Sequence, residues 1–156
     1  MKRHRLSCVL GSLVFLLASV AEARAQGVGF SGGIAFDPTQ AFAGVLFESQ
    51  PLVDRFHVRP GIDGAFGNDL QLAIIYVLFM YKFSAGPLSP WEVYQGTGPV
   101  VTIERAHGQR SAHGGIGAVF GAAHRNGFFF EFKVAGGGAP SLRLGIGYMI
   151  RPMKQP

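Results

Sequence analysis

Apolar and polar side chains alternate along several stretches of this chain, most clearly in its last third. In 128–135 the even positions are phenylalanine or valine, whereas Glu131 and Lys133 occupy odd positions. In 141–151 the even positions are large and apolar, and the odd positions include Arg143, Arg151 and glycine. Because successive side chains of a strand point to opposite faces, this period of two predicts β-strands with one apolar and one polar face.

Turn-forming residues divide the chain after residue 25 into eight such segments. Asn126-Gly127 is the strongest hairpin signal, because it supplies the positive φ angles of a tight turn. Two of the segments are apolar or small on both faces, so the pattern does not orient them. The expected strands are 28–36, 40–48, 56–66, 70–83, 91–105, 115–124, 128–135 and 141–151, of which 70–83 and 91–105 are the two without orientation.

The first 25 residues have the composition of a cleaved secretory signal peptide. Lys2, Arg3 and Arg5 precede an apolar stretch, and Ala23-Arg24-Ala25 offers small residues at a cleavage site. A retained membrane anchor is the alternative. Cleavage removes the single cysteine, Cys8, and most of the net charge of +5. The mature chain therefore has no thiol chemistry and little attraction for nucleic acid.

The remaining chain is hydrophobic, yet it contains no apolar run long enough for a membrane-spanning helix. The longest run, 72–81, is short of the ~20 residues that a helix needs but suits a tilted strand of ~9–11 residues. Only helices and closed barrels satisfy every backbone hydrogen bond within lipid. We therefore expect residues 26–152 to form an all-β, eight-stranded antiparallel up-and-down transmembrane β-barrel, followed by a short tail at 153–156. The opposite arrangement, a soluble barrel with the apolar face inside, remains open from pattern alone.

Glycine, aromatic residues and alternation recur in five short motifs of the mature chain, and together these resemble the small bacterial outer-membrane β-barrels of the OmpA- and OmpX-like group. The resemblance covers about 28–151 and implies architecture rather than a specific function. The motifs are RPGIDGAFG at 59–67, YQGTGP at 94–99, GGIGAVF at 114–120, GFFFEFK at 127–133 and LRLGIGY at 142–148.

Charged side chains on the polar faces are expected to point into the lumen, where eight strands leave just enough room for side chains. A hairpin that turns around Gly137 would place Glu131 across from Arg143. Buried charges must pair, so we interpret the set as a structural plug of ion pairs; a gate for ions or a catalytic carboxylate are the alternatives. The expected lumen charge cluster comprises Arg59, Asp63, Glu104, Glu131, Lys133 and Arg143.

A basic segment near 107–114 is expected to be a loop at the outer surface. Its side chains are candidates for contact with the phosphates of lipopolysaccharide. The nearby Ser111 invites comparison with lipid A deacylases, but the sequence shows no carboxylate that would orient a Ser–His pair. Metal binding by His107 and His113 is the alternative, although a zinc site needs three or four converging ligands. The candidate anion contacts are Arg105, His107, Arg110 and His113.

These patterns predict a monomeric, non-enzymatic protein of the outer membrane with a structural or surface-interaction role. No cofactor, metal or nucleic acid is expected. The expected partners are outer-membrane lipid, lipopolysaccharide and the barrel-insertion machinery. The alternatives are an outer-membrane lipid-modifying enzyme and a soluble periplasmic barrel that binds an apolar ligand.

Overall fold

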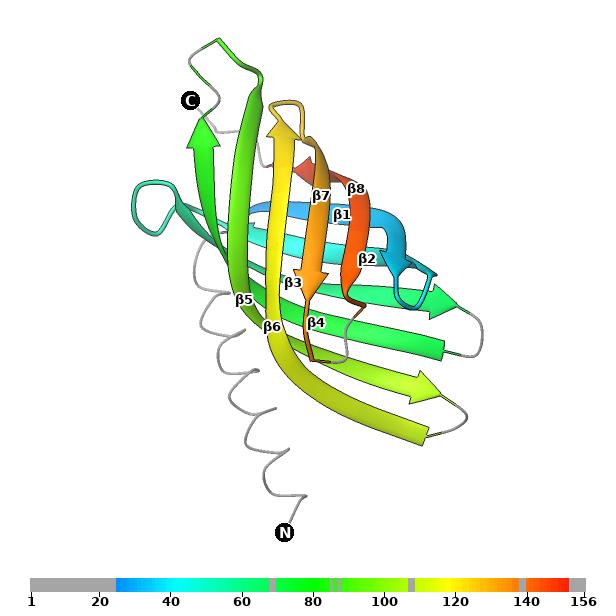
Figure 1. Ribbon diagram of the computed structural model, residues 1–156. Coiled ribbons are helices and arrows are strands. Elements are labelled where there is room, and N and C mark those ends of the chain that lie inside the picture. The colour runs from blue at the N-terminus through cyan, green and yellow to red at the C-terminus, as the bar shows by residue number, and fades with distance from the viewer. Residues whose placement is uncertain are drawn as a thin grey trace.

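The computed structural model describes residues 25–67, 70–84, 86, 88–106, 109–137 and 140–151. These residues form one closed barrel in which each strand pairs antiparallel with its sequence neighbour, and the first strand pairs with the last. Figure 1 shows the strands running up and down around the barrel. The strands are β1 (Ala25–Phe36), β2 (Gln40–Ser49), β3 (Phe56–Gly67), β4 (Leu70–Ser84), β5 (Trp91–Ala106), β6 (Gln109–His124), β7 (Phe128–Ala135) and β8 (Leu142–Ile150).

The predicted eight strands are confirmed, with one large correction at β6. The segment 109–114 was expected to be a loop, but it belongs to β6 and pairs with β5 as far as Ala106↔Gln109. Cross-strand pairing here outweighs the turn propensity of glycine and polar residues. The predicted signal peptide at 1–25, apart from Ala25 at the start of β1, lies outside the described residues, as does the tail at 153–156.

Large apolar side chains cover the outside of the barrel. Phe30 is 52% exposed and Ile146 is 60% exposed, whereas Asp63 on an inward face is fully buried. This is the reverse of a soluble protein, so the apolar face points outward as a membrane barrel requires. We call this surface the outer wall; its most exposed members on the last two strands and on β1 include Phe30, Ile34, Phe130, Phe132, Leu144, Ile146, Tyr148 and Ile150.

The structure also orients the two strands that the pattern left open. Leu78 lies opposite the buried Arg59, and Ile74 lies opposite the buried Asp63, so this face of β4 points inward. Tyr94 of β5 pairs with Lys82 and is buried as well. The lumen was expected to be filled by polar and charged side chains, but apolar ones share it. Those that cluster inside include Leu46, Leu72, Ile74, Leu78, Met80, Val119 and Phe129.

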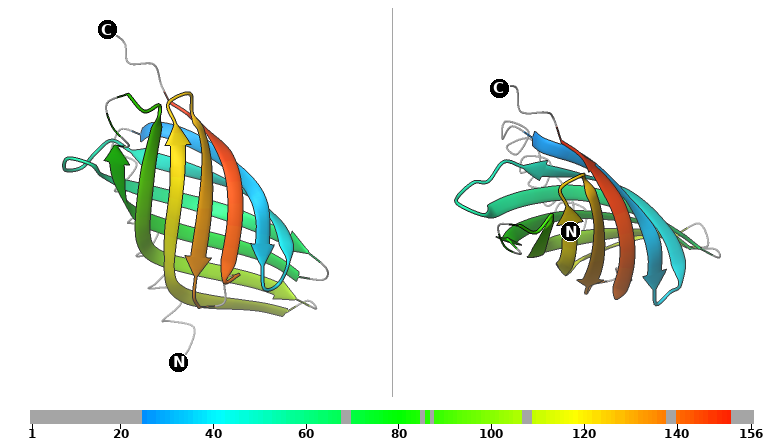
Figure 2. Two further views of the ribbon diagram at one scale, coloured as in Figure 1. Left: turned by 45° about the horizontal axis from the view of Figure 1, so that its top comes forward. Right: turned by 90° about the horizontal axis from the view of Figure 1, so that it is seen from above.

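The barrel has two unlike ends. One end, which we call the terminal mouth, carries the start of β1, the end of β8 and the connections 50–55, 86–90 and 125–127. At the other end, the far end, β5 and β6 continue past the ends of β7 and β8 (Figures 1 and 2). None of the described residues belongs to a helix that is long and apolar enough to cross a membrane.

Candidate functional site

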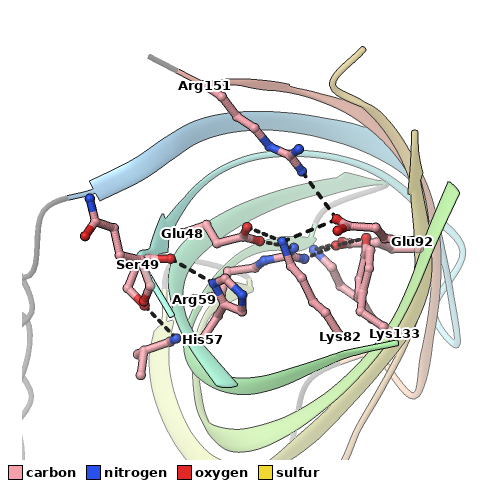
Figure 3. Close-up of polar contacts among 12 residues, drawn as sticks. Glu48, Ser49, His57, Arg59, Lys82, Glu92, Lys133 and Arg151 are labelled. Carbon is pink, nitrogen blue, oxygen red and sulfur yellow. Dashed lines mark hydrogen bonds and ion pairs between the residues drawn. The ribbon is translucent and has the colours of Figure 1, made fainter. Parts of the chain in front are cut away.

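Seven charged side chains from five strands meet inside the barrel and form one continuous chain of ion pairs. Positive and negative groups alternate along it, as the close-up in Figure 3 shows for the part nearest the terminal mouth. We call this set the lumen network. In order along the chain it comprises Lys82, Glu48, Arg59, Glu131, Lys133, Asp63 and Arg143.

The half of the lumen network near the terminal mouth is centred on Arg59. Its Nη2 donates to Glu48 Oε2 at 2.6 Å, and its Nη1 donates to Glu131 Oε1. Glu48 also accepts from Lys82 Nζ, at 2.5 Å. Because a guanidinium presents its donors in a planar fork, one arginine can link two carboxylates on different strands. Arg59 therefore joins β2 to β7 across the lumen.

The other half of the lumen network is centred on Asp63. Its Oδ2 accepts from Arg143 Nη1 at 2.6 Å and from Lys133 Nζ at 3.2 Å. Lys133 also lies 3.3 Å from Glu131 Oε2, which connects the two halves. Two tyrosines complete the arrangement: Tyr94 donates to Glu131 at 2.8 Å and Tyr76 donates to Asp63 at 3.3 Å. Asp63 and Glu131 are buried, and these contacts hold them in place rather than available to solvent.

Five of the six residues predicted for the lumen charge cluster lie in this network, but not with the predicted register. Glu131 was expected opposite Arg143; instead Lys133 lies opposite Arg143 and Glu131 lies opposite Gly145. The register of β7 against β8 is therefore shifted by two residues of β8 from the expected one. Glu104 is not part of the network: it lies opposite Ser111, toward the far end.

Glu48 and Lys82, which extend the lumen network toward the terminal mouth, were not predicted from the sequence. Glu48 is the last residue of its predicted strand. Because it follows the apolar Phe47, alternation places it on the polar face, and this was the signal that could have identified it. Lys82 lies in an apolar segment whose faces could not be told apart. Among the described residues, no three histidine, cysteine, aspartate or glutamate side chains gather as a metal ion would require.

A second feature is the part of β6 that runs beyond β7, which we call the edge segment (109–114). The pairing of β6 with β7 begins at Gly117↔Ala135, and Gly136 N donates to Ile116 O at 3.0 Å. The edge segment has no partner strand on that side within the part of the chain that the structure describes. All of its residues are exposed, and it runs roughly 20 Å along the strand direction past the end of β7.

The backbone of the edge segment presents hydrogen-bonding groups to its open side. Ile116 O points toward β7. In a strand the backbone N–H and C=O groups of every second residue point to the same side. The N–H and C=O groups of Gly114, Ala112 and Arg110 therefore point away from β5, and the Gly114 carbonyl lies against the backbone of Gly137. The outer wall also ends here, because the edge segment carries only polar or small side chains. The edge segment lies beyond Ile116, the last large apolar residue on the outward face of β6.

The residues predicted as outward anion contacts are placed on strands rather than in a loop. Arg105 and Arg110 lie directly opposite each other on the lipid-facing side of β5 and β6, one step beyond Ile103. His113 faces the inner side with Ser111, and its Nε2 lies 3.2 Å from Ser111 Oγ. His107 lies outside the described residues.

Comparison with solved structures identifies the same architecture in two membrane proteins. Neisserial surface protein A superposes with a TM-score of 0.58 and 12% identity, covering 81% of this chain and 95% of that protein. The outer membrane enzyme PagL superposes with a TM-score of 0.51 and 11% identity, covering 81% of this chain and 99% of that one. No family model and no curated protein matches the sequence. This likeness shows that the chain has the fold of a small membrane β-barrel, and its apolar outer wall is the surface that such a fold presents to lipid.

Proposed function

We propose that this outer-membrane barrel is a non-enzymatic surface-interaction protein, whose lumen is closed and whose edge segment binds extended segments of other proteins outside the cell. The observation that carries the proposal is the open edge at 109–114, which projects from the end of the membrane wall. The signal peptide predicted from the sequence would leave both termini, and hence the terminal mouth, in the periplasm. The far end then faces outward.

An unpaired strand edge is a template for a further strand, because it offers a row of free N–H and C=O groups. Proteins usually protect such edges with proline, a bulge or an inward-pointing charge. The edge segment contains no proline, and no irregularity interrupts its pairing with β5. Its outward side chains are small at Ala112 and Gly114, so a partner strand can approach closely.

Lipopolysaccharide is the second partner that we propose, through Arg105 and Arg110. Two like charges directly opposite each other on a sheet destabilise the pairing unless an anion lies between them. This pair follows Ile103 on the outward face, which supports a position near the end of the apolar surface, where a lipid phosphate would lie. Two guanidinium groups can bind one phosphate through parallel hydrogen bonds.

Substitution of Ala112 by proline is expected to abolish binding at the edge while leaving the barrel folded. Ala112 directs its N–H to the open side, and proline is tolerated on an edge strand when only that N–H is lost. The probe is a synthetic peptide of alternating threonine and valine. Amide hydrogen exchange in detergent micelles is expected to show that this peptide slows exchange at residues 110, 112 and 114 of the original chain, and that the proline variant does not bind it.

Two controls separate edge pairing from loss of structure. Ala112→Thr retains the N–H and is expected to bind the peptide as the original chain does, and heat-dependent migration on a detergent gel reports folding of each variant. The same peptide with every second amide N-methylated cannot form the ladder. Equal binding of the methylated and unmethylated peptides would rule out strand addition.

A lipid-modifying enzyme is a second candidate, because the Ser111–His113 contact resembles part of a nucleophile and base pair. Glu104 lies opposite Ser111, but no carboxylate among the described residues contacts the His113 ring. Without an orienting group the pair is incomplete. We expect that Ser111→Ala and His113→Ala leave the mass spectrum of lipid A unchanged in cells that express the chain. A loss of acyl chains that depends on both residues would favour the enzyme.

A further inference from the structure

A polar cavity of about 270 Å³ opens at the terminal mouth, apart from the edge segment and the proposed lipopolysaccharide contact. It lies between the connection 50–55 and the strand ends that meet there. Figure 3 shows Lys82, Glu92 and Arg151 directed toward one another at this end of the lumen network. The charged and polar side chains that line the cavity are Asp54, Arg55, His57, Lys82, Glu92 and Arg151.

The cations of this cavity are held loosely on the side that faces the opening. Lys82 Nζ and an Nη of Arg151 each lie 4.0 Å from the same oxygen of Glu92. A separation of 4.0 Å is too long for a hydrogen bond, and a polar contact of this length leaves room for an intervening oxygen atom. Arg55 forms no ion pair with any described residue. Within the described part of the chain, Arg55 and Arg151 therefore have no carboxylate within hydrogen-bond distance, whereas Lys82 also pairs with Glu48 on its inner side.

The inner side of the cavity is rigid by comparison. Lys82 is mostly buried and is fixed by Glu48 at 2.5 Å. The His57 ring is buried and contacts the backbone oxygen of Ser49 through Nδ1 at 2.9 Å. Because a carbonyl oxygen only accepts, Nδ1 carries the hydrogen, and Nε2 is left without a partner among the described residues. The cavity thus combines a fixed floor with two solvent-accessible arginines, Arg55 and Arg151, at its rim.

We propose that this cavity binds a small solute through a single carboxylate group, held by Lys82 at the floor and by Arg55 and Arg151 at the rim. The two rim arginines favour this class of ligand, because neither Arg55 nor Arg151 has a carboxylate of the described residues within hydrogen-bond distance, whereas Lys82 is already paired with Glu48. A guanidinium also fits a carboxylate through two parallel hydrogen bonds. A phosphate dianion would bring a second negative charge close to Glu92 and Asp54.

Nuclear magnetic resonance of the mature chain in detergent micelles tests the proposal, with sodium acetate as the probe and sodium chloride at equal ionic strength as the reference. Acetate is expected to shift the side-chain N–H signals of Arg55 and Arg151 in a saturable manner. Arg151→Gln is expected to weaken acetate binding by about tenfold, the equivalent of one lost charged hydrogen bond. Arg125→Gln is the matched control, because Arg125 lies exposed at the same mouth but outside the cavity.

Three results would overturn the proposal. Shifts that rise in proportion to acetate without saturation would show that only bulk ions are present. Equal affinity in Arg151→Gln and Arg125→Gln would show that binding is not in the cavity. Tighter binding of phosphate than of acetate would contradict the assignment to a carboxylate. None of these readouts involves the edge segment, so the proposal fails or stands independently of the surface interaction.

Discussion

Replacing Glu131 by alanine is expected to lower the free energy of unfolding of the barrel by about 3–5 kcal/mol. Glu131 joins the two halves of the lumen network, because it pairs with both Arg59 and Lys133. Its removal leaves two buried cations short of a partner and the Tyr94 hydroxyl without its acceptor. Urea titration in lipid vesicles, followed through the fluorescence of the single tryptophan, Trp91, measures the loss.

Glu104→Ala is the matched control for that experiment. Glu104 is also a glutamate on an inward face, but it lies toward the far end and forms no ion pair with the described residues. Its removal is expected to change stability by less than about 0.5 kcal/mol, as for a surface position. Equal small losses in both variants would mean that the lumen network is solvated, and the interpretation of a closed lumen would then be wrong.

The second large effect is expected on the opposite face of the same hairpin. Ile146→Arg places a charge in the outer wall and is expected to destabilise the barrel by about 2–4 kcal/mol in a bilayer. Ile146 lies between Phe130 and Gly32 on its two neighbouring strands, well within the apolar surface. Arg143, three residues earlier, is tolerated because it faces Asp63.

Ala112→Arg supplies the comparison for this substitution. It adds the same charge to the lipid-facing side of a strand, but at the end of the outer wall and one step from Arg110, where the expected cost falls to about 0–1 kcal/mol. Both variants are measured by the same unfolding titration in vesicles. A similar cost at the two positions would show that the outer wall does not lie in lipid.

The sequence predicted the fold well where charged and apolar groups fall on opposite faces. In β3, β7 and β8 the charged residues Arg59, Glu131 and Arg143 occupy alternate positions, and the structure places them inside. In β4 both faces are apolar, because Ile74 and Met80 fill the lumen while Phe79 on the other face meets the lipid. No pattern of polarity can separate two apolar environments.

The site was harder to predict than the fold, because its parts depend on contacts between distant strands. Glu48 and Lys82 are 34 residues apart, and they meet because β2 and β4 both pair with β3 and direct these side chains into the lumen. The edge segment was missed for a similar reason. Glycine and polar residues at 109–114 indicate a loop when taken alone, and their extended form depends on the length of β5 beside them.

The order of strands around the lumen network has a consequence for assembly. Arg59 and Asp63 belong to the third strand, whereas Glu131, Lys133 and Arg143 arrive only with the final hairpin. An intermediate that stops at six strands therefore leaves Asp63 without both of its cations and Arg59 with Glu48 as its one carboxylate, in a lumen still open to water. Neutralisation of the buried charges and pairing of β1 with β8 occur in the same step. The incomplete barrel therefore gains little stability until β7 and β8 have joined it.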